Sequence, residues 1–137
     1  SALSRQIAEI EAGLKPPVLS VGALFTARDF TDVRDTVRAY YLLLERGTPG
    51  EVYNVGSGVS HTIKELLDIL LSFAKVKIEI KPDQTRLRPS DVLVSRCDYS
   101  KLHLATGWKP AISFEDGLKY TLDYWREQVK SLSVEKV

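Results

Sequence analysis

Three charged side chains in two separate stretches of the sequence have the chemistry of a site for a nucleotide. Arg28 opens the stretch Arg28-Asp-Phe-Thr-Asp-Val-Arg-Asp35, while Arg88 and Asp91 bound Arg88-Pro-Ser-Asp91. A guanidinium can hold a phosphate or a base edge through two parallel hydrogen bonds. A carboxylate can accept hydrogen bonds from two ribose hydroxyls. We therefore take Arg28, Arg88 and Asp91 as candidate binding residues.

Each of these residues also has a purely structural interpretation. Arg28 can cap a helix or pair with Asp29 or Asp32, since charges on a loop are commonly paired or solvated. Arg88, with Arg86 two residues before it, can belong to a solvated basic loop. The residue types alone leave both interpretations open.

Three further features offer weaker chemistry. Gly56-Ser57-Gly58 lacks the third glycine of a dinucleotide-binding loop and the Gly-Lys-Ser/Thr ending of a Walker loop, so it predicts a tight turn. His61 precedes a predicted helix, and the sequence implies no carboxylate partner for it. Cys97 has Arg96 beside it, which can lower the thiol pKa, although a buried thiol is usually inert. We expect no catalytic residue among them.

Composition restricts the classes of protein that the chain can belong to. A net charge of +1 argues against strong binding to nucleic acid or to an anionic membrane surface. No apolar run approaches the roughly 20 residues of a membrane span. The single Cys97 fits a cytoplasmic location, and a total of two histidines and one cysteine argues against a zinc site. The absence of methionine leads us to expect a domain cut from a longer protein.

The elements that must position these side chains follow from the periodicity of apolar residues. Alternating helical and strand patterns predict an α/β fold, with one domain over residues 1–130 and a frayed tail over 131–137. Helices are expected at 4–12, 32–46, 62–74, 100–106 and about 114–130. Strands are expected at 18–21, 27–30, 51–55 and 77–81.

Two expectations concern how these elements pack. The helix at 32–46 has a periodic apolar stripe that we expect to face the core: Val33, Val37, Tyr40, Tyr41 and Leu44. The strands at 18–21 and 27–30 are candidates for a hairpin, although no tight two-residue turn signal separates them. The turn from strand 27–30 into the next helix would place Arg28 at the carboxyl end of a sheet, where α/β proteins bind ligands.

Five motifs occur in an order that resembles a known family. They are Arg28–Asp35, Gly50-Glu-Val-Tyr-Asn-Val-Gly-Ser-Gly58, Arg88-Pro-Ser-Asp91, Asp98-Tyr-Ser-Lys101 and Thr106-Gly-Trp-Lys-Pro110. Together they resemble the C-terminal, substrate-binding part of extended short-chain dehydrogenase/reductases that act on nucleotide sugars. Gly47-Thr-Pro-Gly-Glu51 and the Arg-Pro-Ser-Asp form most resemble the GDP-mannose 4,6-dehydratase family. The related GDP-4-keto-6-deoxy-mannose reductases are hard to separate from it.

The resemblance implies a fold and a set of roles. It implies a small mixed sheet with four to five helices, the substrate-binding lobe of such an enzyme without its Rossmann domain. Arg28 would contact the nucleotide of a GDP-sugar, Arg88 its diphosphate and Asp91 its ribose. The NADP (or NAD) loop and the Tyr-x-x-x-Lys pair belong to the N-terminal domain of the family and do not occur in this sequence.

The same resemblance implies what the chain would do by itself. We expect no catalytic residue and no cofactor in these 137 residues, with the missing Rossmann domain as a partner. Self-association through an apolar face left without that domain is also expected. The alternative from another class of protein is a stand-alone nucleotide-binding module without catalysis.

Overall fold

The computed structural model describes residues 2–83 and 94–134, so the predicted site residues Arg88 and Asp91, with Arg86, lie outside the described residues. The elements follow one another as α1 (Ala2–Glu11), β1 (Val18–Val21), β2 (Ala27–Asp29), α2 (Val33–Arg46), β3 (Ser60–Thr62), α3 (Ile63–Ser72), β4 (Glu79–Pro82), α4 (Ser100–Thr106) and α5 (Phe114–Val134). The predicted α/β class is confirmed, with five helices in the described part.

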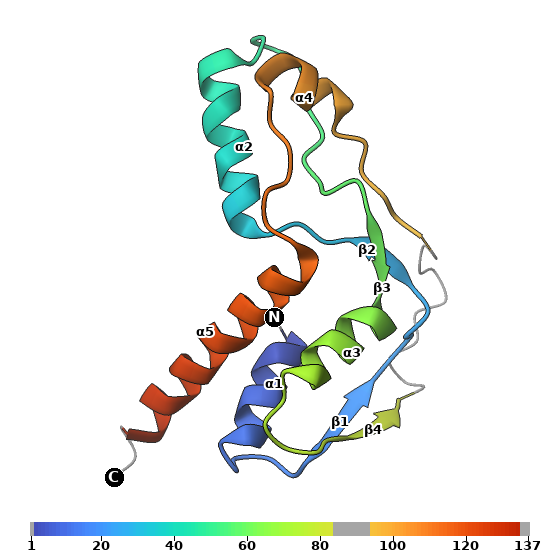
Figure 1. The fold of residues 1–137 in the computed structure, drawn as a ribbon, viewed down its shortest axis with the longest axis vertical. Coiled ribbons are helices and arrows are strands. Elements are labelled where there is room, and N and C mark those ends of the chain that lie inside the picture. Colours follow the sequence, from blue (N-terminus) through green and yellow to red (C-terminus); the bar gives the residue numbers. More distant parts are fainter. Residues whose placement is uncertain (1, 84–93, 135–137) are drawn as a thin grey trace.

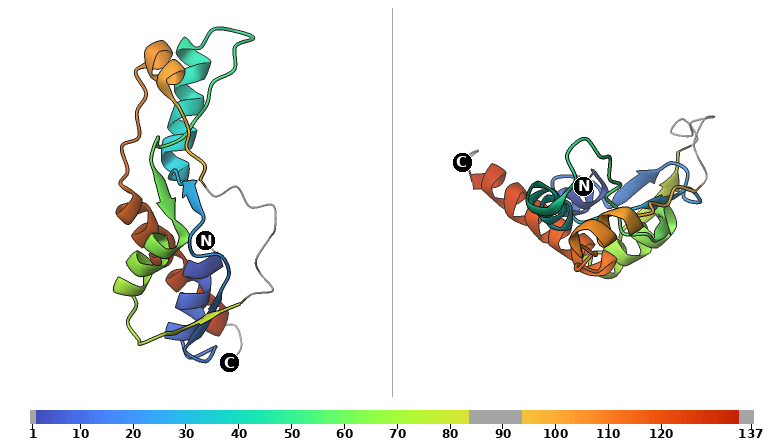
Figure 2. Two further views of the ribbon diagram at one scale, coloured as in Figure 1. Left: turned by 90° about the vertical axis from the view of Figure 1, so that its right-hand side faces the viewer. Right: turned by 90° about the horizontal axis from the view of Figure 1, so that it is seen from above.

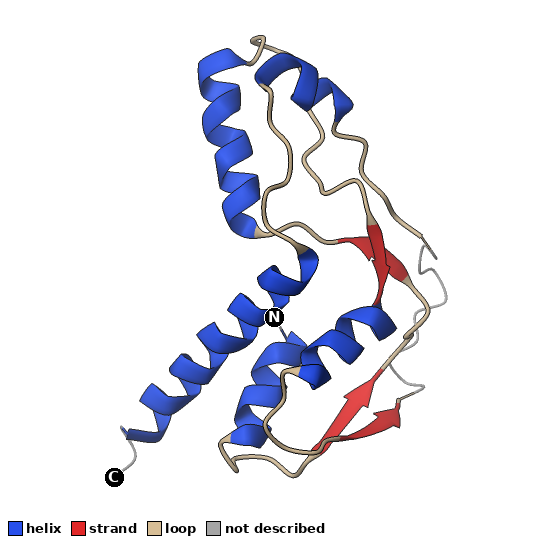
Figure 3. Cartoon of the chain, in the orientation of Figure 1, coloured by secondary structure: helices blue, strands red, loops and turns tan. Residues whose placement is uncertain are grey.

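The molecule is elongated and has two ends (Figure 1). One end holds α2 and α4, and the other holds α1, α3 and α5 with the β1–β4 pair. The short β2–β3 pair lies between the ends, and a view from the side gives the same arrangement (Figure 2). All four strands lie along the side of the molecule opposite α2 and α5 (Figure 3).

The strands form two separate pairs rather than the hairpin that the sequence suggested. β1 runs parallel to β4, with Val18 opposite Glu79, and β2 runs antiparallel to β3, with Arg28 opposite His61. The chain between β1 and β2 cannot fold back as a hairpin because α3 engages it. Leu24 and Thr26 accept hydrogen bonds from the first backbone amides of α3 through their carbonyl oxygens.

The strand expected at 51–55 is wrong, since the structure places the third strand at Ser60–Thr62 instead. The alternation of apolar and polar residues in 51–55 comes from packing beside helices, because Tyr53 and Val55 pack against the core around Trp108. The Tyr53 hydroxyl accepts a hydrogen bond from the backbone amide of Thr48, 3.0 Å away. Side-chain burial, without a neighbouring strand, therefore explains the alternating pattern.

Three groups of buried apolar side chains form the cores of the two ends. The first joins α1, α3 and α5 through Ile7, Ala8, Leu66, Leu70, Leu122 and Val129. The second joins α1, β1 and α3 through Ile10, Leu19, Val21 and Leu67. The third joins α2 and α4 through Ala39, Leu102 and Trp108.

The apolar stripe of α2 faces outward, which corrects the expectation that it forms core. Exposure in this stripe runs from 57 % at Val37 to 88 % at Leu44. We call Val33, Val37, Tyr40, Tyr41 and Leu44 the outward stripe. The buried residues of α2 are Asp35 and Ala39 on its other side, because the small Ala39 side chain lets the helix approach Trp108 closely.

The helix ends follow the capping signals of the sequence. Asp32 caps α2 by accepting a hydrogen bond from the Arg34 amide, 2.9 Å away. Thr62 and Glu65 form the predicted capping box at the start of α3. α5 continues to Val134, four residues beyond its expected end. Among the described helices, none has the length and apolar character that a membrane span requires.

Candidate functional site

Arg28 lies in the middle strand of a small three-segment arrangement. β3 pairs with β2 on one side, and Val94 forms a parallel bridge with Ala27 on the other. The Ser95 amide donates a hydrogen bond to the Ala27 carbonyl at 3.0 Å, which fixes this second neighbour. The Arg28 side chain is half-buried, and its Nη1 donates to the Ala27 carbonyl at 3.1 Å. The backbone of Arg28 is therefore held from both sides.

The two carboxylates considered as partners of Arg28 both bind other groups. Asp32 binds the Arg34 guanidinium through both oxygens, at 2.8 and 2.9 Å. Asp29 accepts hydrogen bonds from the segment 56–58 and from Cys97. The helix-capping role that the sequence allowed for Arg28 is performed by Asp32.

The Asp29 carboxylate joins three segments that are far apart in sequence. It accepts from the Ser57 amide at 2.8 Å, the Ser57 hydroxyl at 2.6 Å, the Gly58 amide at 2.8 Å and the Cys97 amide at 3.0 Å. Burial raises the pKa of Asp29, but the hydrogen bonds from Ser57, Cys97 and Gly58 outweigh it and leave the pKa below its ordinary value. Sequence reasoning missed this role, which fixes the strand that carries Arg28.

The segment 56–58 binds the Asp29 carboxylate and not a phosphate. The Ser57 and Gly58 amides, which would have to face a phosphate, both point at the Asp29 carboxylate. Gly56 is required because a Cβ there would overlap the Cys97 side chain. Gly58 has φ +78°, a left-handed conformation that favours glycine. The structure shows bends at 56 and 58 that lead into β3, in place of the predicted tight turn, and the requirements at Gly56 and Gly58 explain the composition of the segment.

The contacts of Cys97 and His61 give both residues structural roles. Burial raises the pKa of the Cys97 thiol, and the carboxylates of Asp29 and Asp98 raise it further, against the lowering that Arg96 suggested. The His61 ring stacks on Phe114 with the ring centres 4.0 Å apart. Glu65 lies 3.8 Å from His61 Nδ1, but its carboxylate already accepts the Thr62 amide in the capping box. Neither residue is arranged for nucleophilic or acid–base catalysis.

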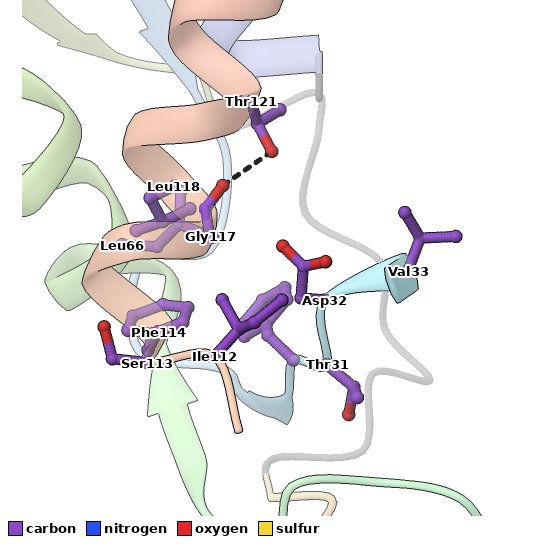
Figure 4. A pocket seen from close by; sticks show the side chains of 11 residues that line it. Thr31, Asp32, Val33, Leu66, Ile112, Ser113, Phe114, Gly117, Leu118 and Thr121 are labelled. Carbon is purple, nitrogen blue, oxygen red and sulfur yellow. Dashed lines mark hydrogen bonds between the residues drawn. The ribbon is translucent and has the colours of Figure 1, made fainter. Parts of the chain in front are cut away.

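A cavity of about 310 Å³ opens where β2 leads into α2 and α5 begins (Figure 4). Its wall is largely apolar and includes stacked Phe30 and Phe114, whose ring centres are 5.6 Å apart. Its carboxylate, Asp32, is neutralised by Arg34. Arg28 is not among the lining residues. The cavity therefore lacks cationic groups that would hold a diphosphate, and it is distinct from the predicted nucleotide site.

The described residues on either side of 84–93 are anchored near the strands. The Asp83 amide donates to the Val21 carbonyl at the end of β1, at 2.8 Å. On the other side Val94 bridges Ala27, the neighbour of Arg28. Of the three predicted site residues the structure thus places Arg28, while the meeting of Arg28 with Arg88 and Asp91 stays a prediction.

Comparison of the sequence with known proteins gives a consistent result. Residues 1–121 match the sequence profile of a family described as GDP-mannose 4,6 dehydratase. The GDP-6-deoxy-D-mannose reductase of Pseudomonas aeruginosa is 39% identical over 130 residues, which are 95% of this chain and 43% of the reductase. GDP-mannose 4,6 dehydratase 1 of Arabidopsis thaliana is 32% identical over 123 residues, 88% of this chain and 34% of that protein.

Solved structures agree with the sequence matches. The structure of RMD from Pseudomonas aeruginosa complexed with NADPH superposes with a TM-score of 0.85 at 39% identity, over 93% of this chain and 42% of that one. The UDP-glucose 4-epimerase of Thermotoga maritima, solved with UDP-glucose, gives a TM-score of 0.74 at 30% identity, over 94% and 40%. The chain spans less than half the length of these relatives.

Proposed function

Because this chain belongs to the GDP-mannose 4,6 dehydratase family, we propose that it is the part of a family enzyme that binds the nucleotide sugar, with a GDP-sugar as its ligand. The observation that carries the proposal is the match of 95% of the chain to a relative named for a GDP-linked sugar. The position of Arg28 supports it, because the strand that carries this guanidinium is held from both sides before the ligand arrives.

The proposed roles divide the nucleotide among three residues. Arg28 contacts the nucleotide, Arg88 binds the diphosphate through paired hydrogen bonds, and Asp91 accepts hydrogen bonds from the ribose hydroxyls. One described feature supports a joint site. Val94, which follows Asp91 by three residues in sequence, bridges Ala27 beside Arg28.

This binding would serve catalysis that takes place elsewhere in the enzyme. Energy from holding the GDP group, remote from the reacting carbons, orients the hexose for reaction. The parent reaction in a dehydratase converts GDP-mannose into GDP-4-keto-6-deoxy-mannose and water. NADP supplies hydride transfer when bound, and we propose no residue of this chain as its ligand. The isolated chain is therefore expected to bind without turnover.

A second candidate for the parent enzyme has a specific observation in its favour. The chain is 39% identical to the Pseudomonas GDP-6-deoxy-D-mannose reductase and 32% identical to the Arabidopsis dehydratase. This difference favours a reductase of GDP-4-keto-6-deoxy-mannose as the parent. Both candidates place the same GDP group on the same lobe, so the binding proposal is common to them.

Isothermal titration calorimetry with GDP tests the proposal. We expect weak but measurable binding, and a loss of about tenfold or more in affinity for Arg28→Ala and for Arg88→Ala, because each removes a charge-assisted hydrogen bond worth about 1.5–3 kcal/mol. Arg46→Ala is the matched control, since Arg46 lies at the far end of α2 and donates to the Thr106 carbonyl.

Two results would count against the proposal. Equal affinity in the wild type and both site variants would remove the diphosphate and nucleotide roles. Tighter binding of UDP than of GDP would keep a nucleotide site but overturn the GDP assignment. Circular dichroism of each variant shows whether a loss of binding reflects unfolding.

A further inference from the structure

Phe25 is an exposed aromatic residue just before the strand that carries Arg28. The chain has four phenylalanines, and Phe30, Phe73 and Phe114 pack against the core that joins α1, α3 and α5. Phe25 lies instead in the turn between β1 and β2, and it is 65 % exposed. This turn runs along the side of the molecule opposite α2 and α5 (Figure 1). The fold therefore forgoes at Phe25 the stabilisation that burial of an aromatic ring provides.

The backbone on both sides of Phe25 is fixed by the first turn of α3. The Leu24 carbonyl accepts a hydrogen bond from the Lys64 amide at 2.9 Å, and the Thr26 carbonyl accepts one from the Ile63 amide at 3.0 Å. A single exposed apolar side chain is ordinary on a protein surface. An aromatic ring on a backbone that is held from both sides differs, because a ligand that binds to it has little chain entropy to remove.

The other aromatic residues outside the helices are packed. The Tyr53 ring lies against the core around Trp108, with Lys101 Nζ 4.9 Å from its centre. The Tyr99 ring meets the Trp108 ring edge-on, with the ring centres 5.4 Å apart. Among the phenylalanine, tyrosine and tryptophan residues outside the described helices, Phe25 is the one with an exposed side chain.

We propose that Phe25 stacks on the base of the nucleotide that Arg28 contacts. The inference rests on the proposed function, which supplies the nucleotide. Phe25 and Arg28 are separated by two residues, so their α-carbons are at most about 11 Å apart. A nucleoside diphosphate carries an aromatic base and charged phosphates on one ribose. One such ligand can therefore meet the ring with its base and the guanidinium with its polar part.

Stacking on Phe25 has a recognisable effect on base preference. Every base has a π-face, so an aromatic ring provides affinity for all of them without reading their hydrogen-bonding edges. A purine has two fused rings and covers more of the phenyl face than a pyrimidine does. Loss of the Phe25 ring should therefore weaken the binding of GDP more than the binding of UDP.

Calorimetric titration of the chain tests the stack, with GDP titrated directly and UDP measured by its displacement of GDP. Phe25→Ala is expected to weaken GDP binding at least about fivefold, and UDP binding by a smaller factor. Phe25→Trp is expected to keep the affinity for GDP, because the indole restores a stacking surface. Tyr40→Ala is the matched control, since Tyr40 is an aromatic residue that is 58 % exposed on α2, and it should leave both affinities unchanged.

The Phe25→Trp variant also gives a direct optical signal. Guanine quenches the emission of an indole on which it stacks, so emission of the variant should fall on addition of GDP by more than the emission of the wild type does. Trp108 is buried and Trp125 packs against the core, and the wild-type titration measures the contribution of both. A purely structural role of Phe25 would produce no such additional quenching.

Three results would overturn the stack: equal GDP affinity in the wild type and Phe25→Ala, equal losses for GDP and UDP, or no additional quenching in Phe25→Trp. Equal losses would mean that Phe25 supports the fold of the site and does not contact the base. In each case the proposed function stands if Arg28→Ala and Arg88→Ala still weaken GDP binding. A wild-type chain that binds no GDP would overturn the proposed function and the stack together.

Discussion

At the scale of single residues, the carboxylates of half-buried Asp29 and buried Asp35 hold distant segments together. Asp29 holds the segment 56–58 and Cys97, as described above. Asp35 is 2 % exposed and does the same at the other end of the molecule, where it accepts the Ala111 and Ile112 amides at 3.0 and 2.9 Å. Each carboxylate accepts hydrogen bonds from backbone amides that have no neighbouring strand to donate to. The irregular segments at 56–58, 97 and 111–112 are therefore held in place without strand pairing.

Asp29→Asn tests whether the Asp29 carboxylate holds these segments together, at nearly constant side-chain volume. The substitution removes the charge and turns an NH₂ donor toward amides that are themselves donors, so we expect the free energy of unfolding to fall by about 2–4 kcal/mol. Urea denaturation measures the change. Asp68→Asn is the control, because Asp68 is an exposed partner of Lys64 and should change stability by less than about 0.5 kcal/mol.

The fall of the unfolding free energy at acidic pH provides a second measurement on the same variant. A folded-state pKa below the unfolded value of 3.8 means that Asp29 contributes stability above that pH and loses it as pH falls through the folded pKa. Unfolding free energy should therefore fall less steeply below about pH 3.8 in Asp29→Asn than in the wild type. Parallel curves would show that Asp29 has the same pKa in both states.

At the scale of elements, helices could be predicted from sequence and strand partners could not. The capping box at Thr62 and Glu65 and the apolar spacing behind it are local signals, and both are confirmed. β2 and β3 have three residues each and exist because Asp29 and Arg28 meet Ser60 and His61 across the chain. The outward stripe was wrongly expected to face the core for a different reason. Periodicity shows that one side of a helix is apolar, but not which partner covers that side.

The candidate nucleotide site shows the same division. Residue chemistry proposes Arg28, Arg88 and Asp91, and of these the structure places Arg28, on a strand held from both sides, while the site itself stays a prediction. Sequence could not find the support of that strand, because the partners of Asp29 lie 28 to 68 positions away. The signal that was available is Gly56-Ser57-Gly58, whose two glycines imply close approach by another segment.

Thr62→Ala tests the best-predicted element. Loss of the Thr62 hydroxyl leaves the Glu65 amide, 3.0 Å away, without its acceptor. We expect a loss of about 1 kcal/mol in unfolding free energy by chemical denaturation. Thr48→Ala should have a smaller effect, since Thr48 is exposed and the substitution keeps its backbone amide, which donates to Tyr53. A smaller loss for Thr62 than for Thr48 would contradict the capping role.

At the scale of the whole molecule, the first and last helices are packed on each other. Arg126 of α5 binds both oxygens of Glu11 of α1, at 2.7 and 2.8 Å, and also the Phe73 carbonyl at 2.7 Å. The Arg126 side chain is 14% exposed and the Glu11 side chain 7%. This ion pair therefore closes the end of the molecule that α1, α3 and α5 form.

Arg126→Leu tests the closure. Removing the cation leaves the Glu11 carboxylate buried beside one remaining amide donor from Lys75, so we expect a loss of about 3 kcal/mol. Glu11→Gln in the same background should recover part of that loss, because the uncompensated charge is gone. Thermal and urea unfolding of the two single variants and the double variant measure the coupling. Additive losses would show that the pair is not an energetic unit.

The packing of α1 against α5 also fixes the order in which the molecule can be completed during synthesis. The core around Trp108 uses residues between α2 and Trp108, so that end can close as soon as Trp108 has left the ribosome. α1 is made before these segments, but its buried Ile7 and Ala8 meet not only Leu66 and Leu70 of α3 but also Leu122 and Val129 of α5, which are made much later. The side of α1 that packs on α5 therefore stays uncovered until α5 has been made, which makes it a binding segment for a chaperone.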